Sequence, residues 1–111
     1  KRYIKVTEKQ KRKDLFMDKK WEAFCENWLA DYPDILTVLE VKAITGYCKT
    51  SVQGWIYRGL IEAFLTRRSN KIPKESLLRF MSSNKFRNMH VKSKILKLKL
   101  SEFERVINNE N

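Results

Sequence analysis

Residues 36–60 read LTVLEVKAITGYCKTSVQGWIYRGL, a pattern that predicts two short helices joined by a tight turn. Thr37 and Glu40 have the spacing of a capping box, in which each side chain bonds the backbone amide of the other residue. A helix is therefore expected to begin after Thr37. Gly46 can adopt positive φ, so the chain can turn sharply where this helix ends.

A second helix is expected to start at residue 49 or 50 and to run to residue 58. Gly59 follows it, at the position where a glycine commonly lets the chain leave a helix. One side of this helix is apolar and would face the core, and the opposite side is polar. The apolar side consists of Val52, Trp55 and Ile56.

A small β-hairpin is expected after the second helix. Two short apolar segments, 60–65 and 71–73, flank a polar and basic tip at residues 66–70. Pro73 then starts a further helix, which the sequence Ser82-Ser83-Asn84 ends. Residues 85–93 are polar and are expected to be irregular.

The N-terminal segment predicts a long aromatic helix. Residues 1–12 are expected to be irregular, and a helix should run from Asp14, as its N-cap, to about Tyr32, with Pro33 as its stop signal. Its apolar residues recur in steps of three and four, so they share one side. This side either packs in the core of the same chain or forms a partner or oligomer surface. The aromatic residues proposed for that surface are Trp21, Phe24 and Trp28.

The C-terminal segment is expected to contain a strand and a short helix. Apolar and lysine residues alternate over residues 95–100, as in a half-buried strand. Ser101 and Glu104 have the spacing of a second capping box, which would open a helix after Ser101.

Composition limits the classes of function. The chain has 111 residues and a net charge of +11, which fits one domain with a polyanionic partner. The charge balance is +6 over residues 1–20, −4 over 21–48, +7 over 49–89 and +2 over 90–111. No apolar run is long enough to span a membrane, and the charged N-terminus does not have the pattern of a signal peptide. A cytoplasmic location is expected.

Catalysis is not expected. The chain contains one histidine, His90, and two distant cysteines, Cys25 and Cys48, which do not have metal-ligand spacing. Glycine-rich phosphate loops and nucleophile motifs are absent from the sequence. We therefore expect no enzyme, no metal and no cofactor.

The polar side of the second helix and the hairpin tip are the candidate binding residues. An α-helix fits the major groove of B-DNA, and a preceding helix can brace it at a fixed angle. Glutamine can bond adenine, and arginine in a wing suits phosphates or a narrow minor groove. Arg58 is expected to bond either phosphate or the helix C-terminus. The candidate DNA-binding residues are Lys49, Thr50, Ser51, Gln53, Gly54, Arg58, Arg67, Arg68, Asn70 and Lys71.

Residues 35–82 resemble the excisionase-type DNA-binding domain, which is related to MerR-like winged helices. The resemblance rests on the stretches LTVLEV at 36–41, TGYCKTSV at 45–52, WIYRGL at 55–60 and KIPKE at 71–75. Two residues depart from the family pattern. Cys48 stands where serine usually caps the recognition helix, and Gly54 stands where arginine or lysine is usual.

The resemblance implies a winged helix-turn-helix, mainly α with a small β-hairpin wing and here with an additional N-terminal amphipathic helix. The expected organisation is a basic tail and aromatic helix (1–34), the DNA-binding domain (35–82) and a lysine-rich C-terminal extension packed on or flanking that domain (83–111). It implies a double-stranded DNA-binding protein that bends attachment-site DNA, as a recombination directionality factor of a phage or integrative element does. The partners would be an integrase and further copies of the chain on DNA. The location that the resemblance implies is the bacterial cytoplasm, on the nucleoid when DNA is bound. The alternatives are a small transcriptional regulator of a mobile element, and a protein-interaction module that uses the aromatic helix.

Overall fold

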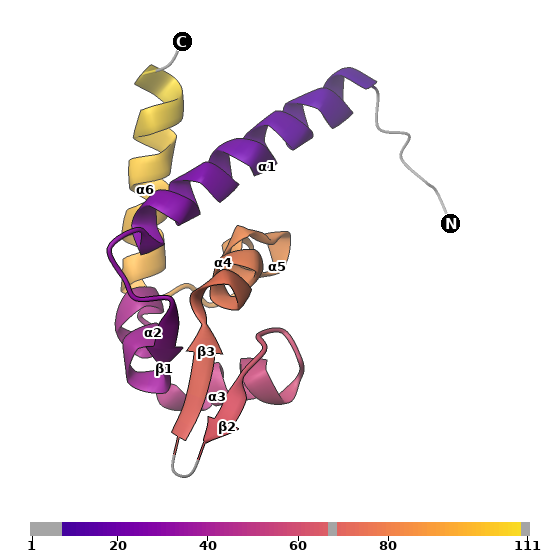
Figure 1. Cartoon of the computed structure of the whole chain (residues 1–111). Coiled ribbons are helices and arrows are strands. Elements are labelled where there is room, and N and C mark those ends of the chain that lie inside the picture. The colour runs from indigo at the N-terminus through magenta and orange to yellow at the C-terminus, as the bar shows by residue number, and fades with distance from the viewer. Residues whose placement is uncertain (1–7, 67–68, 110–111) are drawn as a thin grey trace.

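The computed structural model describes residues 8–66 and 69–109, with side chains described from Met17 onward (Figure 1). Helices predominate, and a small three-stranded sheet lies among them, which confirms the predicted fold class. The elements are, in chain order, α1 (Glu8–Leu29), β1 (Ile35–Thr37), α2 (Val38–Thr45), α3 (Lys49–Tyr57), β2 (Phe64–Thr66), β3 (Ser69–Pro73), α4 (Lys74–Ser82), α5 (Asn84–Arg87) and α6 (Lys94–Asn109).

The sheet has the strand order β1-β3-β2, and both outer strands run antiparallel to β3. Strands β2 and β3 form a hairpin as predicted, in which Phe64 pairs with Lys71. Its strand bounds differ from the prediction, because residues 60–63 precede the first strand and Thr66, Ser69 and Asn70, expected in the tip, belong to the strands. Strand β1 was not predicted, because three residues are too few to show an alternating pattern. Its Leu36 pairs with Ile72, and both side chains are fully buried. This pair attaches the sheet to the core.

The start of α2 and the turn after it follow the prediction. The Glu40 amide donates to the Thr37 hydroxyl over 3.2 Å, and the Thr37 amide donates to the Glu40 carboxylate over 3.1 Å. These two bonds confirm the capping box. Gly46 has a φ of 77°, and its amide donates to the Lys42 carbonyl over 2.8 Å, which ends α2.

The end of α3 is fixed by two backbone hydrogen bonds around Gly59, whose φ is 75°. The Leu60 amide donates to the Trp55 carbonyl over 2.9 Å, and the Gly59 amide donates to the Ile56 carbonyl over 3.0 Å. This pair of bonds is the Schellman arrangement, which requires a left-handed residue after the helix. The predicted role of Gly59 is confirmed.

An aromatic cluster forms the centre of the core. Trp55 of α3 is 1% exposed, and its ring centroid lies 4.9 Å from that of Phe80 on α4 and 6.2 Å from that of Phe86 on α5. Tyr47, from the turn between α2 and α3, meets the same tryptophan edge to face at 5.3 Å. Ring pairs in such orientations add about 0.5–1.5 kcal/mol each to the free energy of area burial. The cluster therefore ties α3 to the two helices that follow the hairpin.

Helix α1 is longer at its start and shorter at its end than predicted. It begins at Glu8, so Asp14 is inside the helix and is not its N-cap, and it ends at Leu29, four residues before Pro33. Residues 8–13 are mainly Lys, Arg, Gln and Glu, which favour helices without an apolar pattern. The prediction of irregular structure is wrong from residue 8 onward, and residues 1–7 lie outside the described part of the chain.

The aromatic side of α1 packs inside the same chain. Trp21 is fully buried and donates its indole N–H to the Met81 carbonyl over 2.8 Å. Phe24 is half-buried, stacks on Trp21 at 5.5 Å and lies 5.5 Å from Phe103 of α6. Trp28 is also half-buried and approaches Phe86. The alternative of a partner surface is wrong for Trp21, because α4 and α6 already cover it.

The C-terminal segment is one helix, so the predicted strand over 95–100 and the helix start at Ser101 are both wrong. Ser93 starts α6 instead: its hydroxyl accepts the Leu96 amide over 3.1 Å and donates to the Thr45 carbonyl over 2.6 Å. Leu96 and Phe103 are buried, and helical spacing places them on one side. In Figure 1, α6 starts beside α2, crosses α1 and extends away from the hairpin.

Within the described residues, no helix is both long enough and apolar enough to span a bilayer.

Replacing Trp21 by alanine should lower the free energy of unfolding by about 3–5 kcal/mol, because a buried ring is lost and the Met81 carbonyl loses its donor. The matched control is Leu98→Ala on α6, where the side chain is 61% exposed and about 0.5 kcal/mol or less should be lost. Urea unfolding followed by far-UV circular dichroism measures both. Equal stabilities of the two variants would contradict the assignment of the aromatic side to the core.

Candidate nucleic-acid interface

Helix α3 presents one side to the core and the other to solvent. Val52 and Trp55 are buried, whereas Thr50, Gln53 and Tyr57 are exposed and Gly54 is half-buried. At 100° per residue these last four residues lie on one side of the helix. We call the group Thr50, Gln53, Gly54 and Tyr57 the outer face of α3.

The other predicted residues of α3 border this outer face. Lys49 is exposed in the first turn. Ser51 is half-buried, and its hydroxyl lies 3.3 Å from the Cys48 sulfur. Arg58 is exposed, and its Nε–H donates to the Gly54 carbonyl over 3.3 Å. The sequence predicted that Arg58 bonds either phosphate or the helix C-terminus. This bond corresponds to the second role.

The hairpin carries the remaining predicted residues. Asn70 and Lys71 lie on β3 and are half-buried. The Thr66 hydroxyl donates to the Ser69 carbonyl over 3.0 Å and closes the hairpin turn. Arg67 and Arg68, predicted for the tip, lie outside the described residues. Figure 1 places the hairpin at the end of the molecule opposite to the C-terminus of α6.

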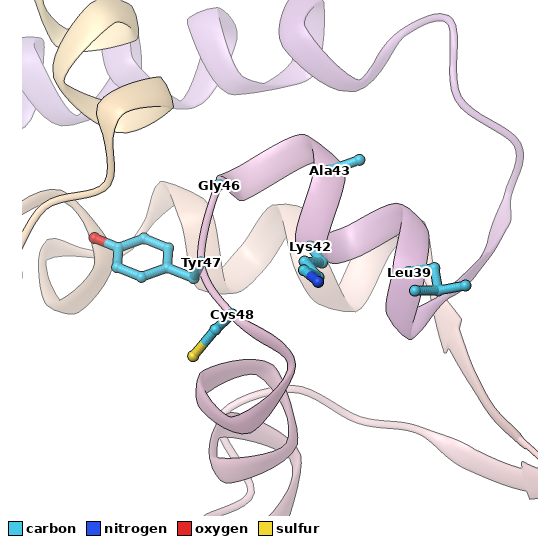
Figure 2. A pocket seen from close by; sticks show the side chains of 6 residues that line it. All are labelled: Leu39, Lys42, Ala43, Gly46, Tyr47 and Cys48. Carbon is cyan, nitrogen blue, oxygen red and sulfur yellow. The ribbon is translucent and has the colours of Figure 1, made fainter.

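A hollow opens where α2 meets α3, and Figure 2 shows the side chains around it. Leu39 of α2 is 70% exposed at one end, and Cys48 lies at the other, where the chain enters α3. A second hollow runs along α3 beside residues 89–91, with Gly54 and Arg58 in its wall. Two residues of the outer face, Thr50 and Gly54, line this second hollow. The first hollow is lined by Leu39, Lys42, Ala43, Gly46, Tyr47 and Cys48.

The fold does not require a glycine at position 54. A Cβ placed on it would meet nothing within 4 Å, and its φ lies outside the left-handed region. The contrast is Gly46, where a Cβ would lie 3.0 Å from the Ser93 hydroxyl oxygen and 3.1 Å from Ile95. Gly46 is therefore needed for the turn and for the contact with α6, whereas Gly54 leaves a stretch of bare backbone on the outer face.

The two cysteines differ in environment. Cys48 is the N-cap of α3 but makes no side-chain capping bond. Helix α3 therefore lacks the cap that a serine hydroxyl would provide at this position. The hydrogen bond between its sulfur and the Ser51 hydroxyl lowers the pKa of the Cys48 thiol. Burial raises the pKa of Cys25 to about 12. The exposed thiol is therefore the more acidic of the two.

Acidic residues are distributed unevenly over the structure. The acidic block of residues 21–34 lies on α1 and the segment after it, where Glu22, Glu26, Asp31 and Asp34 are exposed. Helix α3 and the described residues of the hairpin strands contain no aspartate or glutamate. A polyanion would meet less repulsion at α3 and the hairpin than at residues 21–34.

Tyr57 is a member of the outer face that was not among the predicted binding residues. Its side chain is 92% exposed, although it is a large aromatic residue. Its spacing of seven residues from Thr50 already places it on the polar side of α3, so the signal was present in the sequence.

Residues 35–85 match a family model whose description is helix-turn-helix domain. The match runs from β1 into α5, and so it contains the two helices, the hairpin and α4. It supports a DNA-binding helix-turn-helix domain in this part of the chain. No curated protein and no solved structure matches the chain.

Replacing Gly54 by alanine should raise the free energy of unfolding by about 0.5–1 kcal/mol, because alanine favours a helix and its methyl group meets no neighbour here. The control is Gly46→Ala, which should destabilise the protein because of its positive φ and the crowding by Ser93 and Ile95. Thermal unfolding of both variants measures the difference. A loss of stability in Gly54→Ala would reveal a structural need that the geometry does not contain.

Iodoacetamide should label Cys48 in the folded protein and label Cys25 only after unfolding. The reactive form is the thiolate, so the labelling rate of Cys48 should rise with pH. The midpoint of this rise should lie at a lower pH than for a free thiol, because the pKa of Cys48 is lowered. Mass spectrometry of labelled peptides gives both rates. The variant Cys48→Ala should take up no label while folded, and rapid labelling of Cys25 in that variant would contradict its burial.

Proposed function

We propose that this protein binds double-stranded DNA with a sequence preference, placing the outer face of α3 in the major groove. The observation that carries the proposal is the outer face itself: a polar side of a helix with no role in the core, held by the aromatic cluster of Trp55. The family match over residues 35–85 supports the same function. Base edges in the major groove offer hydrogen-bonding groups and the thymine methyl to such a helix.

Affinity would come mainly from the phosphates. Lys49 lies at the start of α3, beside the outer face, and Lys71 lies on β3 of the hairpin. Neither lysine forms an ion pair within the described residues. Arg67 and Arg68 of the hairpin tip would add further phosphate contacts, and Asn70 a neutral one. Each neutralised phosphate releases counterions, so binding should weaken steeply as salt rises.

We further propose an excisionase-like role, in which several copies bind side by side and bend attachment-site DNA so that an integrase acts in the excision direction. This role rests on the resemblance of residues 35–82 to excisionase-type domains and on the net charge of +11. A transcriptional regulator would use the same interface without the bend. The third alternative, a protein-interaction module built on the aromatic side of α1, loses support because Trp21 is buried.

Selection from a pool of random duplexes at two salt concentrations tests the function. The expected result is an enriched motif with repeated half-sites, whose binding weakens at the higher salt. Salt-sensitive binding without a motif would contradict sequence preference, and no binding at low salt would overturn the proposal. The selected site, placed at different positions in fragments of equal length, then tests bending: mobility should depend on its position for an excisionase-like protein.

Gln53→Ala and Lys49→Ala should have different effects on binding. Loss of Gln53 should reduce discrimination against the wrong base pair by about 1–3 kcal/mol at one position of the motif. Loss of Lys49 should weaken binding to all duplexes and reduce the slope of log K against log salt by about one. Fluorescence anisotropy with the selected duplex and a scrambled duplex measures both quantities.

The matched control for this pair is Lys97→Ala, which removes an exposed lysine from α6. It should change neither discrimination nor the salt slope. An equal effect of Gln53→Ala on the selected and scrambled duplexes would exclude Gln53 from base recognition.

A further inference from the structure

The outer face of α3 is electrically neutral, although the chain as a whole is strongly basic. Its three side chains are those of Thr50, Gln53 and Tyr57, and Gly54 lies between them. The two cations of this region lie off the face. Lys49 is in the first turn, and Arg58 is the C-cap residue, with its Nε–H on the Gly54 carbonyl.

This composition disfavours the reading of guanine. The commonest specific contact to guanine is a pair of hydrogen bonds from arginine or lysine to O6 and N7. No arginine or lysine stands on the outer face, and the Arg58 side chain is folded back onto its own helix. A helix with this surface would gain little from G·C pairs.

The same composition favours A·T pairs. Gln53 has the amide that pairs with N6 and N7 of adenine. Thymine presents a methyl group, which is the apolar group of the major groove, and the threonine methyl and the tyrosine ring are apolar partners for it.

Gly54 provides space for such a methyl group. It lies one turn after Thr50 and almost one turn before Tyr57. Nothing lies within 4 Å of the position that a Cβ would occupy. A methyl group can therefore approach the bare backbone between the two side chains.

Tyr57 has no role in the fold that would explain an aromatic residue at this position. It is 92% exposed, and no hydrogen bond or ring contact is formed by it within the described residues. It contrasts with Tyr47, which is packed on Trp55 and donates its hydroxyl to the Val91 carbonyl over 3.0 Å. A large ring fully open to water on the proposed binding side is available for contact with a ligand.

We propose that the outer face of α3 is a thymine-methyl reader, with Tyr57 as the specificity-determining residue and Gly54 as the point of close approach. Gln53 would fix the register by bonding an adenine in the same or the next base pair. This inference rests on the proposed function, because it specifies which base pairs that interface selects. The preferred site would contain A·T pairs where α3 enters the groove.

The test replaces thymine by uracil in the selected duplex, one position at a time, which removes the C5 methyl and leaves base pairing intact. Burial of one methyl group is worth about 0.8 kcal/mol, so affinity should fall about four-fold at each methyl that is contacted. In Tyr57→Ala the affinity for the thymine duplex should fall, and uracil should then have little further effect at the position that the ring contacts. Tyr57→Phe should retain the response to uracil, because the ring remains.

Control measurements separate the possible outcomes. Leu98→Ala removes an exposed apolar side chain from α6 and should leave the response to uracil unchanged. Far-UV circular dichroism checks that each variant is folded. A selected motif made only of G·C pairs, or equal binding of thymine and uracil duplexes, would overturn the inference and leave the proposed function intact. Failure to bind any duplex would overturn both.

Discussion

The packing of Trp55 against Phe80 and Phe86 determines how the rest of the structure is arranged. This indole is buried on the inner side of α3, so the opposite side of the helix must face solvent. The partners of Trp55 come from α4 and α5, which follow the hairpin in sequence. One cluster of rings therefore fixes both the rotation of α3 about its axis and its position relative to the hairpin. A nine-residue helix would have little stability alone, and the cluster supplies what local propensity does not.

The segments outside the matched domain reinforce this arrangement. Helix α1 packs on α4 through Trp21, and α6 is attached to the end of α2 through the bond from Ser93 to Thr45. Tyr47 links the turn after α2 to Val91. These contacts leave the outer face of α3 uncovered within the described residues, while the acidic residues of α1 lie on another part of the molecule. The fold thus separates a scaffold side from a side that is free to meet DNA.

The sequence predicted those elements whose signals are local. The capping box at Thr37 and the glycines 46 and 59 require particular backbone geometry, so they could be read directly. Strand β1 and helix α6 could not, because three residues carry no period and the alternating leucines of 95–100 fit a strand as well as a helix. Of the candidate residues on α3, Thr50, Gln53 and Gly54 lie on the outer face, whereas Lys49, Ser51 and Arg58 border it. Tyr57 was not among the candidates. Its spacing from Thr50 indicated the polar side of α3, but its exposed fraction of 92% depends on the tertiary packing around the helix.

The most direct test of the account is a titration of the ¹⁵N-labelled protein with the selected duplex, followed by amide chemical shifts. We expect the largest changes at the amides of the outer face of α3 and at those of β3. The exposed side of α1, at Glu22 and Glu26, should change little. The largest changes on α1 or α6, with α3 unaffected, would contradict the claim that the aromatic cluster orients α3 for DNA.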